Sequence, residues 1–229
     1  MKKRKLKKSV KIILCGIFMG VIATATTIGL LAMNGSSIKV VNFVNQKKSD
    51  VEKWRKDNDI DVIGKKMTIA GAGGAATAIE IQAALDGVKE MSIFNIKDKF
   101  WANAEETVKK IRENTDCIVN LYDLDDKDKL REEIADSYLF AQATGVGMKP
   151  LEGQTVVPDE TYFRPDLIVT DTVYAPRETE TLRLAKKAGC KTMNGLGMML
   201  FQGDAAFHLW TGKHMPIDHM KEVLDIKYD

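Results

Sequence analysis

The sequence predicts a doubly wound α/β fold, in which helices cover both faces of a parallel sheet. Short apolar runs typical of strands alternate with amphipathic, helix-type segments from about residue 61 to the C-terminus. A glycine-rich turn joins the first strand of this series to its first helix. The composition, 45% hydrophobic and 29% charged over 229 residues, is ordinary for a globular protein with one large domain or two small ones.

Each predicted strand is a short apolar run bounded by turn residues or charges, which suits a buried parallel sheet. We expect strands at residues 66–70, 91–94, 118–122, 138–141, 167–170 and 191–193. Helices are expected at residues 75–85, 101–113, 127–135, 178–188, 197–210 and 217–224. The spacing of Ala104, Val108 and Ile111 is helical, and Gly189 is a typical residue for ending a helix. Strict alternation of the two kinds of segment predicts parallel strands.

The first 60 residues are organised differently from the rest. Residues 1–11 carry seven basic side chains and no acidic one, and residues 12–33 then contain no charge over 22 positions. A helix needs roughly 20 such residues to cross the hydrocarbon core of a bilayer. We therefore expect a basic tail at 1–11, a single transmembrane or signal-anchor helix at 12–33, a polar linker or helix at 34–60, and a dinucleotide-binding domain at 61–229.

Two other interpretations of residues 12–33 stay open, a buried core helix and a cleaved signal peptide. The apolar run is longer than the usual 7–15 or so residues of a signal peptide, and the small residues Ala23 and Ala25 lie inside it. Leu14 precedes Cys15, which disfavours lipid attachment at that cysteine. The basic N-terminal flank would keep the N-terminus in the cytoplasm and place the body outside, whereas the cofactor chemistry described below favours a cytoplasmic body.

Charge and cysteine content exclude several classes of function. The net charge is +2, and residues 1–11 contribute +7, so residues 12–229 sum to 2 − 7 = −5. A mildly acidic body lacks the basic footprint of a nucleic-acid-binding protein. The three cysteines are too far apart in sequence for a disulfide framework or a metal motif, and His208, His214 and His219 are not spaced as ligands on one helical face, so we expect no metal.

The turn after the first predicted strand is a candidate phosphate-binding loop. It satisfies the pattern G-x-G-x-x-A in a strand–turn–helix context, through Gly71, Ala72, Gly73, Gly74, Ala75 and Ala76. The first glycine allows the tight turn, the second lets the backbone approach a pyrophosphate, and the small residue at position 76 lets the helix pack on the strand. The helix N-terminus then faces the phosphate charge. A purely structural turn is the alternative.

The end of the second predicted strand bears on which dinucleotide binds. An acidic residue here accepts a hydrogen bond from the 2′-hydroxyl of the adenosine ribose and repels a 2′-phosphate, whereas an arginine favours the phosphate. The segment contains Asp98 and no arginine, which predicts NAD, while Lys97 leaves NADP open. The alternative role of Asp98 is a solvated cap ahead of the next helix.

Taken together, four stretches resemble the shikimate/quinate dehydrogenase family, from about residue 50 to the C-terminus. They are residues 61–66 leading into the glycine turn, 143–150 (ATGVGMKP), 171–176 (DTVYAP) and 194–212, with Asn-Gly-Leu-Gly-Met, Gln-Gly and Leu-Trp-Thr-Gly. The last stretch is highly specific. Residues 95–98 are more similar to the NAD-tolerant quinate/shikimate branch than to the strictly NADP-using branch.

The resemblance implies a role for each matching position. The pyrophosphate loop matches Ala72, Gly73, Gly74 and Ala75, and the adenosine-ribose contacts match Asn95 and Asp98. Lys149 matches a cofactor-contacting position. The wall on the nicotinamide side matches Thr172, Val173, Tyr174, Ala175 and Gly195. Gln202 matches a side chain that hydrogen-bonds substrate hydroxyls, which an amide with donors and an acceptor can do.

The sequence also departs from the family pattern. Gln142 stands where asparagine is usual, Ile96 where arginine is usual, and Ala175 where asparagine is usual. Each departure puts cofactor affinity in question.

The larger departure concerns the catalytic half. Family members begin with a substrate domain that carries a Ser-x-Ser clamp, a catalytic lysine and a catalytic aspartate in Asn-Thr-Asp-Gly. The sequence has no Asn-Thr-Asp-Gly, and Asn114-Thr115-Asp116 is followed by Cys117. We therefore assign no catalytic residue to this chain.

The resemblance implies an NAD(P)-dependent oxidoreductase of aromatic amino acid biosynthesis that converts shikimate or quinate to the 3-dehydro ketone. We expect the chain to be weak or inactive unless a substrate domain is supplied. The alternatives are a membrane-tethered dinucleotide-binding module that acts as a sensor or scaffold, and a fragment without function.

Overall fold

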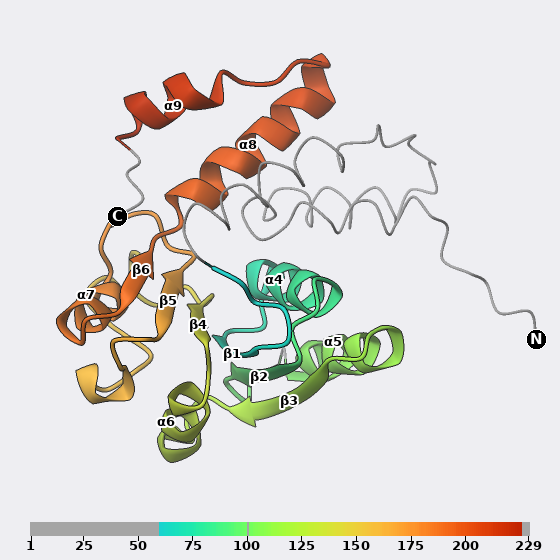
Figure 1. The fold of residues 1–229 in the computed structure, drawn as a ribbon, viewed down its shortest axis with the longest axis vertical. Coiled ribbons are helices and arrows are strands. Elements are labelled where there is room, and N and C mark those ends of the chain that lie inside the picture. The colour runs from blue at the N-terminus through green and yellow to red at the C-terminus, as the bar shows by residue number, and fades with distance from the viewer. Residues whose placement is uncertain (1–59, 100, 226–229) are drawn as a thin grey trace, which may run out of the picture.

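The computed structural model describes residues 60–99 and 101–225. They form a six-stranded parallel sheet with strand order β3-β2-β1-β4-β5-β6, drawn in Figure 1. From β1, at the centre of the sheet, the described chain builds outward to β3, then returns to the centre at β4 and builds outward to β6. The doubly wound, Rossmann-like fold predicted from the alternation of segments is confirmed, and the order of the strands reverses between β1 and β4.

The predicted strands and helices of the domain are all present. The strands are β1 (Lys66–Ala70), β2 (Glu90–Asn95), β3 (Ile118–Asp123), β4 (Leu139–Gln142), β5 (Ile168–Asp171) and β6 (Lys191–Met193). The helices are α4 (Gly74–Leu85), α5 (Trp101–Asn114), α6 (Lys127–Ala135), α7 (Glu180–Lys187), α8 (Leu196–Thr211) and α9 (Ile217–Val223), with a 3₁₀ turn, η2, at Glu160–Tyr162.

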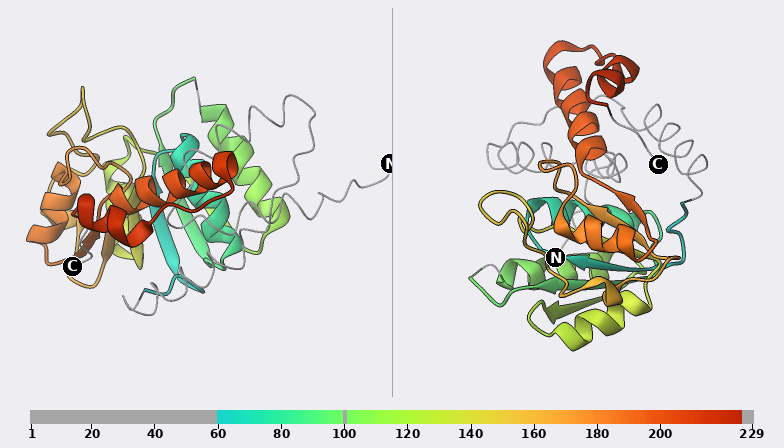
Figure 2. Two further views of the ribbon diagram at one scale, coloured as in Figure 1. Left: turned by 90° about the horizontal axis from the view of Figure 1, so that it is seen from above. Right: turned by 90° about the vertical axis from the view of Figure 1, so that its left-hand side faces the viewer.

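Two hydrophobic clusters cover the two faces of the sheet. The alternation of side chains along β1 sends Met67 and Ile69 to one cluster, shared with α4 and α5, and Ala70 to the other, shared with α6 and α7. Figure 1 shows α4 and α5 on one side of the sheet and α6 on the other. Figure 2 shows that α8 and α9 extend away from the sheet layer as a pair of helices.

Several boundaries differ from the predicted ones by one or two residues. The helix expected from residue 178 begins at Glu180, because the Thr179 side chain accepts a hydrogen bond from the Leu182 backbone N–H and so caps α7. Strands β4 and β5 run one residue further than expected, since Gln142 and Asp171 pair at the end of the ladder. Ile60, assigned to the linker, is 3% exposed and belongs to the core cluster.

The segment predicted to span a membrane, residues 12–33, lies outside the described residues. Within residues 60–99 and 101–225, every helix is too short or too polar to cross a bilayer. The membrane-spanning helix therefore stays a prediction from the sequence.

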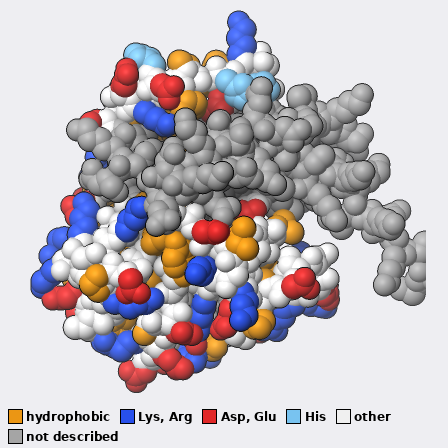
Figure 3. All heavy atoms as spheres, in the orientation of Figure 1, with side chains coloured by type: hydrophobic (Ala, Val, Ile, Leu, Met, Phe, Trp, Pro, Cys, Tyr) orange, Lys and Arg blue, Asp and Glu red, His pale blue; other side chains and the backbone are white. Residues whose placement is uncertain are grey.

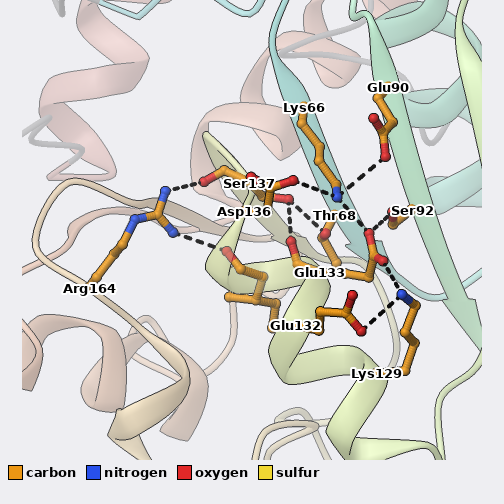
Figure 4. A network of polar contacts seen from close by, with 11 residues as sticks. Lys66, Thr68, Glu90, Ser92, Lys129, Glu132, Glu133, Asp136, Ser137 and Arg164 are labelled. Carbon is orange, nitrogen blue, oxygen red and sulfur yellow. Dashed lines mark hydrogen bonds and ion pairs between the residues drawn. The ribbon is translucent and has the colours of Figure 1, made fainter.

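A buried polar network ties β1 and β2 to α6, as Figure 4 shows. The Glu133 side chain is 6% exposed, and its carboxylate accepts from Ser92 Oγ at 2.5 Å, Lys129 Nζ at 2.7 Å and Lys66 Nζ at 2.8 Å. Burial alone would raise the pKa of Glu133, but the hydrogen bonds from Lys129, Lys66 and Ser92 outweigh it and lower the pKa to about 2. Glu133 is thus buried as a paired carboxylate.

The C-terminal end of α6 is held by the same region. Ser137 Oγ donates to the Glu133 carbonyl and lies 2.8 Å from Thr68 Oγ1 on β1. Arg164 donates to the carbonyls of Ile134, in the last turn of α6, and Ser137, just after the helix. These contacts fix α6 against the amino end of the sheet.

Replacing Glu133 by Gln is expected to destabilise the protein by about 2–3 kcal/mol at pH 7, because two ammonium groups lose their buried counter-charge. The folded pKa, about 2, lies below the ordinary value of 4.5, so this stabilisation is present above pH 4.5 and is lost as the pH falls towards 2. The difference between wild type and E133Q in urea denaturation should therefore shrink in acid.

Glu132→Gln is the matched control for E133Q. The Glu132 side chain is 70% exposed and is paired with Lys129 at the surface, so its loss should have little effect. Equal destabilisation by both substitutions would contradict the role assigned to the network.

A second buried carboxyl is Glu80 on α4. It is fully buried on the helix face of Ala76 and Ala83, which belong to a core cluster, and neither of its carboxyl oxygens makes a hydrogen bond within the described residues. Burial raises the pKa of Glu80 from 4.5 to about 8. Glu80 is therefore neutral in the folded protein at pH 7 and becomes a cost when it ionises.

We expect wild-type stability to fall as the pH rises from 4.5 towards 8, because the raised folded pKa makes the protonated form the favoured one. Glu80→Gln keeps the shape of the side chain without the titration, so E80Q should gain on the order of 3–5 kcal/mol relative to wild type between pH 5 and pH 8. Urea denaturation at several pH values measures this. Glu106→Gln, on the exposed surface of α5, is the control, and parallel pH profiles for wild type and E80Q would refute the prediction.

Candidate functional site

The loops that follow the strands meet at the carboxyl edge of the sheet. Backbone hydrogen bonds continue the ladder beyond the strand ends and join each loop to its neighbour. They run from Leu124 N to Asn95 O (2.9 Å), Gly71 N to Phe94 O (2.7 Å), Ala143 N to Ala70 O (2.8 Å), Thr172 N to Gln142 O (2.9 Å) and Gly195 N to Val173 O (3.0 Å). Every predicted cofactor loop is thus anchored in this edge row of bonds.

Gly71 brings the first of these loops against the loop after β4. Its φ is +111°, and a Cβ added there would lie 2.6 Å from the Ala143 carbonyl oxygen. Both the conformation and the contact therefore require glycine. The contact lies between β1 and β4, where the strand order reverses, which is where doubly wound folds bind their ligands.

The N-terminus of α4 is open towards this point. The helix begins at Gly74, no side chain caps it, and its first turn holds no acidic residue. A Cβ added to Gly73 or Gly74 would meet nothing within 4 Å, whereas Ala76 is fully buried against the sheet. Helix-end N–H groups that no described side chain caps, beside space that the described residues leave open, suit an anion, so the predicted pyrophosphate loop has the geometry to hold one.

Gln142 organises the loop beside the glycine turn. It is fully buried, its Oε1 accepts from the N–H and the hydroxyl of Thr144 at 2.7 Å each, and its Nε2 donates to the Val146 carbonyl at 2.8 Å. Gln142 stands where the family usually has asparagine, and both ends of its amide make hydrogen bonds that shape this loop. Lys149 is exposed in a turn closed by the bond from Leu151 N to Met148 O, at 2.6 Å.

The predicted ribose contacts follow β2. Asn95 is its last residue, and its Nδ2 donates to the Ile96 carbonyl at 3.0 Å. Asp98 is exposed, and its carbonyl accepts from the Trp101 N–H, so it precedes α5 in a turn. Figure 3 shows Lys and Arg side chains intermixed with Asp and Glu over the part of the visible face that the described residues form.

The predicted nicotinamide wall follows β5, where Thr172 is half-buried, Val173 is buried and Tyr174 and Ala175 are exposed. The buried Asp171 carboxyl accepts from the Val173 N–H at 2.9 Å and the Thr179 hydroxyl at 2.6 Å, which holds both ends of this loop. Burial raises the pKa of Asp171 to about 6.

Gly195 lets the start of α8 reach this wall. A Cβ added there would lie 2.0 Å from the Thr172 carbonyl oxygen. The neighbouring Asn194 donates from Nδ2 to the Arg177 carbonyl at 3.0 Å and accepts from the Leu196 N–H at 3.1 Å. The α8 helix is therefore docked on the loop after β5 by backbone contact.

The docking of α8 on the loop after β5 also places the remaining predicted residue, Gln202. Gln202 is half-buried on α8 and lies seven positions after Gly195, about 10 Å along a helix. Arg177, in the loop after β5, donates to the carbonyls of Leu224 and Asp225 just after α9 and so ties α9 to that loop.

Asp171, Asn194 and Ala143 organise the site but were not predicted to do so. The sequence singles out Asp171 only as part of the stretch 171–176. A buried strand that ends in aspartate is nevertheless a local signal for a carboxyl that holds a loop. Asn194, two residues ahead of a helix, carries the signal of a capping side chain. The contact of Ala143 with Gly71 has no local signal, because the two residues are 72 positions apart.

Gly195→Ala is expected to destabilise the protein by about 2–4 kcal/mol, because the added methyl overlaps the Thr172 carbonyl oxygen and must displace α8 or the loop. Gly74→Ala adds the same methyl into open space at a helix start and is the control, with a change within about 0.5 kcal/mol. Thermal or urea denaturation measures both. Equal stability of G195A and G74A would contradict the contact.

Comparisons with known proteins show similarity in sequence and in fold. Residues 195–224 match the family model of the shikimate 5′-dehydrogenase C-terminal domain. The chain is 62% identical over 164 residues to the shikimate dehydrogenase (NADP(+)) of Listeria monocytogenes serotype 4b (strain F2365), covering 72% of this chain and 56% of that protein. It is 49% identical over 169 residues to the shikimate dehydrogenase (NADP(+)) of Streptococcus uberis, covering 73% of this chain and 57% of that protein.

The fold is also similar to those of solved structures of shikimate and quinate dehydrogenases. Shikimate 5-dehydrogenase from Listeria monocytogenes, in complex with shikimate and NAD, superposes with a TM-score of 0.70 at 58% identity, over 77% of this chain and 61% of that chain. Quinate dehydrogenase from Corynebacterium glutamicum, in complex with NAD, superposes with a TM-score of 0.64 at 25% identity, over 78% of this chain and 61% of that chain. The chain spans little more than half the length of the Listeria relative. In sequence and in fold, the chain resembles members of the shikimate/quinate dehydrogenase family over little more than half of their length, and residues 195–224 match the C-terminal domain of that family.

Proposed function

We propose that the chain binds NAD or NADP across the carboxyl edge of its sheet and forms the cofactor-binding half of an oxidoreductase that acts on shikimate or quinate. The observation that carries this proposal is the uncapped N-terminus of α4, with open space at Gly73 and Gly74, at the point where the strand order reverses. The relatives whose names and structures include NAD or NADP support it.

Each loop would hold a different part of the dinucleotide. Backbone N–H groups of the first turn of α4 would bind the pyrophosphate, where the helix dipole also favours negative charge. The Asp98 carboxylate and the Asn95 amide would receive the adenosine ribose, since both follow β2 at the carboxyl edge. Lys149 would contact the cofactor from the turn after β4.

The nicotinamide would lie against residues 172–175. Asp171 and Thr179 hold the two ends of that loop, and Gly195 closes α8 onto it, so its shape is set before a cofactor arrives. A bound nicotinamide would accept or deliver the hydride. Gln202 on α8 would hydrogen-bond substrate hydroxyls, because its amide offers both donors and an acceptor.

Proton transfer is the step that these residues do not supply. We assign no catalytic acid or base to this chain, and its sequence holds no Asn-Thr-Asp-Gly. Binding a cofactor without a positioned proton relay leaves most of the barrier in place. We therefore propose that turnover of shikimate or quinate is slow unless a substrate domain is supplied.

The proposed membrane segment rests on the sequence alone. The charge-free run at residues 12–33 would tether the body to a bilayer as a single-pass anchor, with the body on the cytoplasmic side, where NAD and NADP are available.

Calorimetric titration of the full chain with NAD and NADP tests the proposed function. We expect binding of at least one dinucleotide, and we expect Gly73→Ala to weaken it by at least about tenfold, because the methyl would occupy the space that the pyrophosphate needs. The melting temperature of G73A should be unchanged, since a Cβ there meets no protein atom within 4 Å.

Glu106→Gln, on the exposed face of α5, is the control for the binding measurement and should bind as wild type does. Absence of binding of either dinucleotide at millimolar concentration would overturn the proposal. A rate of shikimate or quinate oxidation normal for dehydrogenases, followed by NADH or NADPH absorbance, would overturn the account of the proton relay alone.

A further inference from the structure

We propose that Asp123, at the end of β3, lowers the affinity of this chain for NADP relative to NAD by engaging the ammonium group of Lys97. This inference rests on the proposed dinucleotide site and concerns its adenosine end. Asp123 and Asn95 are register partners at the ends of β3 and β2, so Asp123 lies next to the predicted ribose contacts.

Asp123 is held in place on three sides. Its Oδ1 accepts from the Asp125 N–H at 3.1 Å, and its carbonyl accepts from the Asp126 N–H at 3.1 Å. Its Oδ2 lies 3.5 Å from Lys97 Nζ, and the side chain is 26% exposed. The carboxylate is therefore a fixed, partly desolvated charge, and Oδ2 is the oxygen it offers to Lys97.

The ammonium group of Lys97 is attracted towards Asp123 by two neighbouring groups. Its Nζ also lies 5.6 Å from the centroid of the Trp101 ring, at the start of α5, so a carboxylate and an aromatic face both attract the ammonium. The Lys97 side chain is 64% exposed, so the pairing is weak enough to be released by one substitution.

A 2′-phosphate would meet an unfavourable set of charges here. It would add about two negative charges to the ribose beside the predicted contact Asp98. Lys97 and Lys99 are the cations of this segment, and the ammonium group of Lys97 is the one directed to Asp123. A ribose with a 2′-hydroxyl meets no such penalty, so the arrangement lowers affinity for NADP and leaves NAD unaffected.

Asp123→Asn tests the inference. The amide oxygen can still accept from Asp125 N, so the turn is kept while the charge is removed. We expect NADP to bind about 3–10-fold more tightly to D123N than to wild type, as for the release of an exposed ion pair, and NAD to bind within twofold. Calorimetric titration with both dinucleotides measures the ratio.

Two further variants make the test specific. Asp125→Asn removes the same charge two residues away and should leave the ratio within twofold. In Lys97→Met, the further substitution D123N should bring no gain in NADP affinity, because the ammonium group that Asp123 engages is gone.

An unchanged ratio in a D123N protein that binds both dinucleotides would overturn the inference and leave the proposed function standing. A gain that persists in the K97M background would also overturn it, since the effect would then be direct repulsion. A wild-type chain that binds neither dinucleotide would overturn the proposed function, and this inference with it.

Discussion

The row of backbone hydrogen bonds along the carboxyl edge of the sheet is the constraint on which the site depends. Five bonds of 2.7–3.0 Å continue the ladder past the strand ends, from the start of the loop after β3 to the start of α8. Loops are ordinarily the least ordered part of a fold, and here each one is fastened to its neighbour where it leaves the sheet. Parallel strands alone would bring the loops to one edge, and these bonds also set their spacing.

Close backbone approach is the second requirement, and two glycines meet it. Gly71 contacts the carbonyl of Ala143, and Gly195 contacts the carbonyl of Thr172, at separations that no Cβ tolerates. Buried polar side chains then shape the loops. Gln142 makes hydrogen bonds to groups of the loop after β4, and Asp171 does so in the loop after β5. The site is thus built mostly from backbone, which suits a ligand recognised by its phosphates and its flat rings.

Stability and binding are assigned to opposite ends of the sheet. The network around Glu133 and Lys66 joins β1, β2 and α6 at the amino end, where it fixes the sheet without contacting the proposed ligand. Glu80 acts in the other direction, because a buried carboxyl without a partner costs free energy as soon as it ionises.

The sequence by itself determined the secondary structure and the fold class, because hydrophobic periodicity and the glycine turn are local signals that a parallel sheet must obey. It also determined which residues follow which strand, and so placed Asn95, Asp98, residues 172–175 and Gly195 at one edge. Only the tertiary structure decided how these residues are held. The contact of Gly71 with Ala143, the bonds of Asp171 to Thr179 and the pairing of Lys97 with Asp123 join positions that are distant in sequence or lie on different elements. Such contacts depend on the twist and register of the assembled sheet, to which no single stretch of sequence corresponds.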